Sequence, residues 1–232
     1  MFIGKIVKSD SHINYVCQIY GPREVEIEPG SADYAFGRFV RVAIRSPQTE
    51  NANDLSSFGY GISQEPVKYA VGVIYDTILL NPAFGSLGPR LSNETQVELF
   101  SPDYISEKAV LIYVMVLGMM EQRPAPNGKP EFLSMMHGIP QLSLELGSEI
   151  ETMADEEIRE FHFFRDSVGP NSQDPYLHMG YLPHIIGQRN SLLPMVTLHI
   201  IDQLERLFPQ NSALLSIVKR NFAWRLKVET TG

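Results

Sequence analysis

The spacing of hydrophobic residues changes near Thr152, from a period of two to a period of about 3.6, and this change constrains the fold more than any other feature. Before it, runs rich in β-branched and aromatic residues are separated by turn residues, which is typical of strands in an antiparallel sheet. The runs that we interpret as strands are 2–7, 13–20, 24–28, 38–45, 69–80 and 110–120.

The segment after residue 151 predicts three helices. Thr152 and Asp155 have the spacing of a capping box, and acids in the first turn suit the positive end of the helix dipole. We expect Ser191 to cap the second helix and 212–227 to form the third, antiparallel to the second. The apolar stripes expected to face the core are Leu193, Val196, Ile200, Leu204 and Leu207 in the second helix, and Leu214, Leu215, Val218, Phe222 and Leu226 in the third.

Three segments show neither the period of two of a strand nor the period of 3.6 of a helix. Residues 46–66 form a polar stretch that we expect to be a functional or mobile excursion, because long structureless loops are unusual in compact domains. Residues 81–93 are rich in Gly and Pro, and the prolines of 122–130 predict that this segment leaves the sheet.

Charge and cysteine content restrict the compartment and the partners. The chain has 19 Lys and Arg against 27 Asp and Glu, and the net charge of −8 opposes attraction to nucleic acid or anionic lipid. Cys17 is the single cysteine, so we expect a buried thiol and a reducing compartment. The N-terminus does not have the pattern of a secretory signal, and the longest apolar run, 109–120, falls short of the roughly 20 residues that span a bilayer. We therefore expect a cytoplasmic protein without a membrane span.

Several segments of residues 4–146 resemble a known domain. They are FIGKIV at 2–7, YAFGRFVRV at 34–42, YAVGVIYD at 69–76, and the turn 138–140 that precedes 146–150. Together they resemble the HAS barrel, the small β-barrel of HerA-type DNA-translocating ATPases and of the N-terminal domains of rotary ATP synthase subunits. The resemblance implies an α+β, mainly β protein, with a small closed β-barrel in residues 1–150 and a helical subdomain in 151–232. It also implies a homo-oligomer, because such barrels pack side by side into rings.

The positions of three glycines agree with the expected barrel, and a missing phosphate-binding motif argues against an ATPase. Gly4, Gly37 and Gly72 lie in strand-like runs, where glycine permits a bulge or a bend at a barrel corner. HerA-like proteins carry an ATPase domain after the barrel. This chain has no G-x-x-x-x-G-K-[ST] phosphate-binding loop, so we expect it not to hydrolyse ATP.

Other catalytic patterns are weak, and we expect no enzyme activity, no cofactor, and no catalytic or metal-ligating residue. His178 and His184 are candidates for a metal or catalytic role, but six residues separate them, and surface or interface packing is the alternative. A cluster of acids could bind a divalent cation or simply form a solvated helix start. Its members are Glu145, Glu149, Glu151, Asp155, Glu156, Glu157 and Glu160.

The third helix and its surroundings carry most of the basic residues of the C-terminal part. A basic patch beside an aromatic residue predicts contact with an acidic partner or a nucleic acid, whereas the alternative is an ordinary basic helix end with the Trp packed inward. The residues that we predict to make contacts are Arg189, Arg206, Lys219, Arg220, Trp224 and Arg225.

Three functions are compatible with these features. The first is a non-enzymatic module that binds protein partners or assembles with itself. The second is an accessory subunit of a HerA-like nucleic-acid-processing ATPase, which would touch nucleic acid only indirectly or through its basic helix. The third is a small metal-dependent hydrolase that uses His178, His184 and the acidic cluster.

Overall fold

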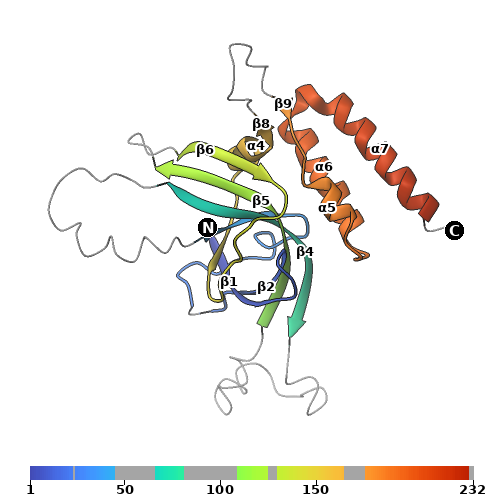
Figure 1. Cartoon of the computed structure of the whole chain (residues 1–232). Helices are drawn as coiled ribbons and strands as arrows, with labels where there is room; N and C mark the ends of the chain where they lie inside the picture. Colours follow the sequence, from blue (N-terminus) through green and yellow to red (C-terminus); the bar gives the residue numbers. More distant parts are fainter. Residues whose placement is uncertain (23, 45–65, 81–108, 125–129, 165–175, 230–232) are drawn as a thin grey trace, which may run out of the picture.

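The computed structural model describes residues 1–22, 24–44, 66–80, 109–124, 130–164 and 176–229 (Figure 1). Within these residues, seven strands form one antiparallel sheet. The expected loops 46–66 and 81–93 lie outside the described residues, apart from Pro66 at the end of the first. The strands are β1 (Phe2–Ser9), β2 (Asn14–Ile19), β3 (Phe39–Ile44), β4 (Val67–Leu80), β5 (Ala109–Pro124), β6 (Pro130–His137) and β7 (Glu149–Thr152).

The strand pairings form a ring. The order of the sheet is β2-β1-β7-β3-β4-β5-β6, and β2 also pairs with β5, so that six strands return to their starting point and β6 is added at one side. The 16-residue length of β5 permits both contacts: Leu111 to Met115 pair with β2, and Gly118 to Pro124 pair with β6.

Two hydrophobic clusters divide the side chains of these strands. The first draws buried residues from all six strands of the ring, for example Ile3, Val42, Ile112 and Ile150. Because successive side chains of a strand point to opposite faces, β3, β4 and β5 also contribute to a second cluster on their other face, which includes Phe39. The first cluster therefore fills the ring, and the second lies between the ring and the helices.

The helices lie on one side of the strands (Figure 1). Every residue of the predicted α6 stripe is buried, and α7 lies beside α6 as the predicted hairpin requires. Since the helices share the second cluster with β3, β4 and β5, the predicted boundary near residue 150 falls within a continuous core and stays a prediction. The helical elements are α4 (Asp155–His162), α5 (Leu182–Ile186), α6 (Leu193–Leu207), the 3-10 helix η1 (Pro209–Asn211) and α7 (Ser212–Glu229), and the short strands β8 (Phe163–Phe164) and β9 (Tyr176–Leu177) pair with each other.

Two predictions about the extent of the sheet are wrong. The segment 24–28 is not a strand: the Glu24 amide donates to the Gly21 carbonyl in a turn, and Ile27 is 72% exposed. Within the segment 122–130 that we expect to leave the sheet, residues 122–124 and 130 do not, because Pro124 and Pro130 pair at the end of the β5–β6 hairpin; residues 125–129 lie outside the described residues. Proline is tolerated there since the last residues of a ladder need no further backbone donor.

Both predicted helix caps are also wrong. Thr152 belongs to β7, and α4 starts after Ala154, whose amide donates to the Glu157 carboxylate at 2.8 Å. Ser191 lies in a turn before α6, whose preceding residue Leu192 makes no side-chain cap bond. The acids of the first turn of α4 are placed as predicted, because the local charge pattern alone specifies them.

The predicted role of glycine at bends holds at two positions. The pairing register shifts next to Gly4 in β1 and next to Gly72 in β4. A Cβ atom on Gly4 would lie 2.1 Å from the Gln18 backbone oxygen, so no larger residue fits between β1 and β2 without separating them. Gly37 instead lies in the turn before β3, with a φ of +81° that favours glycine.

Candidate functional site

The α7 helix has hydrophobic residues on two faces. Leu215 is buried against α6 and Val218 is partly buried, as an inward stripe requires. Three other apolar residues of α7 are exposed instead: Leu214, Ile217 and Trp224 are 53%, 56% and 66% exposed. An exposed apolar stripe on a helix that already packs through its other face is typical of a surface that contacts a partner.

The six predicted contact residues do not form one patch. Arg189 precedes α6 and Arg206 lies in its last turn, so the 15-residue helix separates them by about 20 Å. Lys219 forms an ion pair with Asp202, and its amine lies 3.9 Å from the Glu205 carboxylate. These two acids of α6 raise the pKa of Lys219, and they already compensate its charge.

Arg220 and Trp224 are the two predicted residues that the structure brings together on the exposed side of α7. Four residues apart, they occupy the same face of the helix, and both are exposed. Arg225 lies in the same helix, and its side chain is outside the described part. Trp224 does not pack inward, so the structure removes the alternative of an ordinary helix end with a buried Trp.

Leu214 and Ile217 are functional candidates that sequence reasoning missed. Leu214 is expected in the inward stripe, yet it is exposed, whereas Leu215 and Val218 pack in or against the second hydrophobic cluster. The signal that could have found both residues is their helical spacing from Trp224: Ile217 lies seven residues before it, and Leu214 lies ten residues before it.

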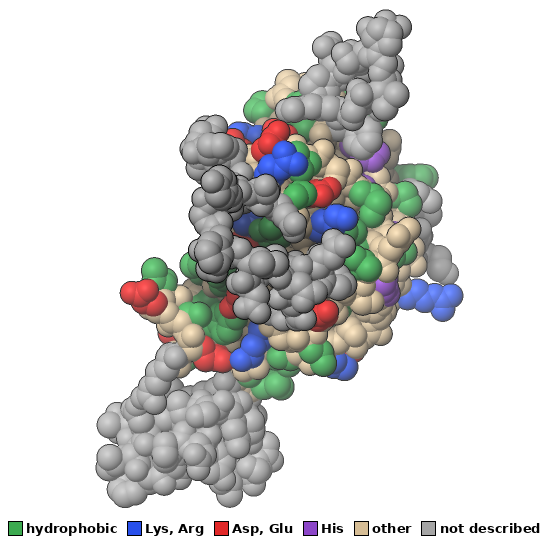
Figure 2. Space-filling model, turned by 60° about the vertical axis from the view of Figure 1, so that its left-hand side comes forward, with side chains coloured by type: hydrophobic (Ala, Val, Ile, Leu, Met, Phe, Trp, Pro, Cys, Tyr) green, Lys and Arg blue, Asp and Glu red, His purple; other side chains and the backbone are tan. Residues whose placement is uncertain are grey.

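The charged side chains that can be seen in Figure 2 are of both signs. On that face, basic and acidic side chains alternate, with hydrophobic side chains between them. The part of the surface seen in this view therefore lacks the continuous basic stripe that electrostatic binding of nucleic acid uses.

Four histidines form a cluster: His137 of β6, His162 of α4, His178 after β9 and His184 of α5. The ring of His137 stacks on that of His178 with centroids 4.8 Å apart, and His184 donates to the Val116 carbonyl at 3.1 Å. His137 donates from Nε2 to the Phe161 carbonyl and accepts at Nδ1 from the Gly180 amide. The structure thus places both His178 and His184 near His137, which their sequence spacing alone did not predict.

His162 lies at the centre of this cluster and is fully buried. Its Nδ1 donates to the Ile158 carbonyl at 2.7 Å, and its Nε2 accepts from the Tyr181 hydroxyl at 2.6 Å. Burial lowers the pKa of His162 to about 3 and that of His137 to about 4, and it raises the pKa of Tyr181. Both rings are therefore neutral at pH 7, and their nitrogens are engaged in hydrogen bonds.

This arrangement favours packing over chemistry. A metal ligand or general base needs a nitrogen lone pair that faces an open position, and Nδ1 of His137 and Nε2 of His162 each accept a hydrogen bond instead. Across the described ranges, no group of three or more His, Cys, Asp or Glu residues is placed to hold a metal ion. Burial also raises the pKa of Cys17 to about 12, which makes it an unreactive thiol.

Replacing Tyr181 by Phe is expected to lower the free energy of unfolding by about 1 to 3 kcal/mol, because Nε2 of His162 would stay buried without a donor. Chemical denaturation monitored by circular dichroism measures the difference. The matched control is Tyr20→Phe, which removes an exposed hydroxyl bond to Glu149 and should cost less than about 1 kcal/mol. Equal losses in the two variants would contradict the assigned bond.

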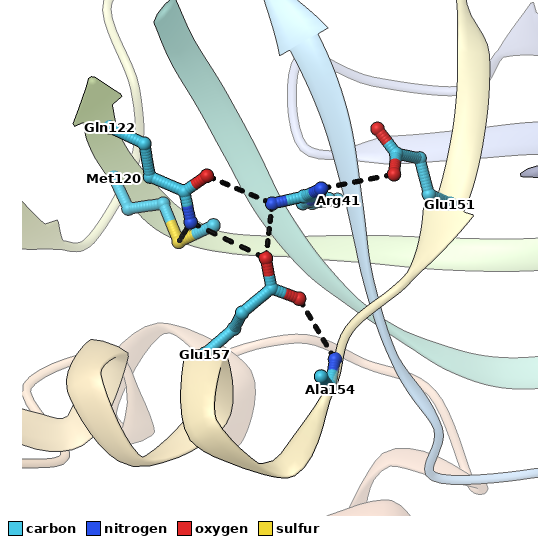
Figure 3. A network of polar contacts seen from close by, with 6 residues as sticks. All are labelled: Arg41, Met120, Gln122, Glu151, Ala154 and Glu157. Atoms are coloured by element: carbon cyan, nitrogen blue, oxygen red, sulfur yellow. Dashed lines mark hydrogen bonds and ion pairs between the residues drawn. The ribbon is translucent and has the colours of Figure 1, made fainter. Parts of the chain in front are cut away.

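A second buried polar centre joins the sheet to α4 (Figure 3). Arg41 of β3 donates to the Glu151 carboxylate and to the Gln122 side-chain oxygen, each at 3.0 Å, and it forms a further ion pair with Glu157 of α4. The guanidinium also lies over the Tyr69 ring, 4.5 Å from its centroid. The side chains of Arg41, Glu151 and Glu157 are 16%, 14% and 12% exposed.

The network accounts for part of the acidic cluster seen in the sequence. Glu151 and Glu157 bind Arg41, and Glu149 accepts a hydrogen bond from the Tyr20 hydroxyl at 2.9 Å. Each of these three acids contacts a side chain of this same chain, either Arg41 or Tyr20. Three of the seven acids are therefore engaged with side chains of the protein.

One family covers nearly the whole chain. A family model described as "Domain of unknown function (DUF8166)" matches residues 1–231. No curated protein sequence matches the chain. Within the described residues, no helix is both long enough and apolar enough to cross a membrane.

Proposed function

The chain belongs to the DUF8166 family along residues 1–231, and we propose that it is a non-enzymatic protein-interaction module whose contact surface is the outward face of α7. The observation that carries the proposal is the exposure of Leu214, Ile217 and Trp224 on a helix whose other face is packed. Burying three large apolar side chains on a partner removes substantial apolar area from water, which is the main driving force for protein association.

We also propose that the ring of six strands is a small closed β-barrel of the HAS type. The support is the return pairing of β2 with β5 and the hydrophobic cluster to which all six strands contribute, because interior side chains fill small barrels. The resemblance further suggests a homo-oligomer, which we expect to use a barrel surface and not α7.

Two features support the absence of catalysis and a cytoplasmic location as parts of this proposal. The lone pairs that a metal or a proton transfer would use on His137 and His162 accept hydrogen bonds from the protein. Cys17 is buried as a free thiol, which suits a reducing compartment.

The proposal predicts that Ile217→Glu abolishes partner capture. A charge in the centre of the stripe must be desolvated on binding, so proteins recovered with the tagged full chain from its native cells should fall by about tenfold or more. Quantitative mass spectrometry measures the recovery. The matched control is Leu146→Glu, which places the same charge at a residue that is 74% exposed outside the helices.

Two results would contradict this function. One is an unchanged set of captured proteins with Ile217→Glu, which would exclude α7 as the contact surface. The other is no captured protein at all with the unmodified chain, together with a strict monomer in light scattering. Capture of a DNA-translocating ATPase that depends on Ile217 would identify the module as an accessory subunit of that motor.

A further inference from the structure

The exposed stripe of α7 has the spacing of a coiled-coil seam. Leu214, Ile217, Asn221 and Trp224 are all exposed and follow one another at intervals of three, four and three residues. These intervals correspond to positions a, d, a and d of a heptad, in which Asn221 occupies the second a position. A single Asn at such a position fixes the register of a helix pair, because it selects a polar residue opposite itself.

The described position beside this seam that carries a charge is basic. In the same register, Arg220 is at g and is exposed, and the sequence places Arg225 at e and Lys227 at g. The other e and g positions of the helix, Val218 and Ala213, are uncharged. The acids of α6 that lie nearest, Asp202 and Glu205, are engaged with Lys219 on the inner side.

This charge pattern disfavours pairing of α7 with a second copy of itself. In a parallel pair, g of one helix faces e of the other, which would bring Arg220 against the Arg225 of the second copy. In an antiparallel pair, g faces g, so that Arg220 of one copy again lies near a cation, the Arg220 of the other. Like charges at these positions destabilise the pair and select against it, whereas a helix with acids at e and g forms ion pairs at the same places.

We propose that α7 binds an amphipathic helix of another protein that has Glu or Asp at its e and g positions and a polar residue facing Asn221. This inference rests on the proposed function and names the class of its partner. The 18 residues of α7 span about 27 Å, or two and a half heptads. A seam this short suits a reversible contact more than a permanent assembly, because short helix pairs bury little area.

Two synthetic three-heptad peptides test the proposal with the full chain. Both carry Leu and Ile at the seam with one Asn, and they differ only in having Glu or Lys at every e and g position. Fluorescence anisotropy should show that the Glu peptide binds about tenfold or more tightly than the Lys peptide, and the difference should shrink as salt is added. Arg220→Glu should narrow or reverse the preference, and Ile217→Glu should remove binding of both peptides, whereas Leu146→Glu should change neither.

The outcomes separate this inference from the function on which it rests. Equal binding of the two peptides, or no binding of either, overturns the acidic partner helix. If capture from cells still depends on Ile217 in that case, the interaction function stands with a partner of different chemistry. A dimer of the chain in sedimentation that Ile217→Glu dissociates would show that a second copy occupies α7, and this too overturns the inference.

Discussion

Replacing Arg41 by Met is expected to lower the free energy of unfolding by about 3 to 5 kcal/mol. The substitution keeps much of the apolar stem but leaves the carboxylates of Glu151 and Glu157 largely buried, close together and without their shared cation. An uncompensated buried charge costs more than a lost surface pair because water cannot reach it to screen the repulsion. Urea denaturation followed by circular dichroism measures the shift of the midpoint.

The matched control is Arg123→Met, which breaks an exposed pair with Glu131 at 3.9 Å and should cost less than about 0.5 kcal/mol. A second variant distinguishes charge from packing: adding Glu157→Gln to Arg41→Met removes one of the two stranded carboxylates and should recover part of the loss. If Arg41→Met unfolded at the same urea concentration as Arg123→Met, the network would have no structural role.

The Arg41 network affects function by positioning α4 against the sheet. Arg41 lies in β3 and Glu157 lies in α4, 116 residues later, so their contact fixes where the first helix sits against the sheet. Residues of α4, such as Ile158, pack in the same cluster as α6 and as the inward side chain Leu215 of α7. Loss of the network is therefore expected to loosen the layer that presents the α7 stripe.

Patterns that act between near neighbours were predictable from the sequence. The β1–β2 hairpin, β3 and β4 follow from the period of two, and the buried stripe of α6 follows from the helical period. In each case, the residues that define the element are neighbours in the chain, so a short window contains the full signal.

Elements that depend on distant partners were not predictable. The alternation of Glu24–Glu28 is as regular as that of a strand, but the described structure offers this segment no neighbouring strand. Conversely, β6 forms because Met135 and Phe132 pack against the second cluster, although the prolines around it indicate a loop. Burial and pairing decide both outcomes, and neither is visible within a short window.

The candidate site illustrates the same limit. The α7 helix has two hydrophobic faces, and the sequence alone cannot indicate which one the core will cover; Leu215 is buried and Leu214 next to it is exposed. The histidine cluster likewise joins His137 to a carbonyl 24 residues away and to an amide 43 residues away. Only the folded chain shows that both ring nitrogens of His137 are engaged with the backbone.

The stability of the protein is expected to fall steeply in mild acid. Burial lowers the pKa of His137 to about 4 and that of His162 to about 3, whereas in the unfolded chain both rings titrate near 6.5. Below pH 6.5 the unfolded state therefore binds more protons than the folded state, and the free energy of unfolding decreases as the pH falls toward the folded values. Between about pH 7 and about pH 4.5, the expected loss is about 3 to 5 kcal/mol.

A variant separates this effect from the titration of carboxylates, which also changes stability in acid. His162→Phe should be less stable than the unmodified chain at neutral pH, because the Tyr181 hydroxyl loses its acceptor, but its stability should depend less on pH. His199→Gln, which replaces an exposed histidine, should leave the pH dependence unchanged because the buried rings are intact. Urea midpoints measured at several pH values compare the three proteins. Parallel curves for His162→Phe and the unmodified chain would mean that the buried ring does not carry the acid sensitivity.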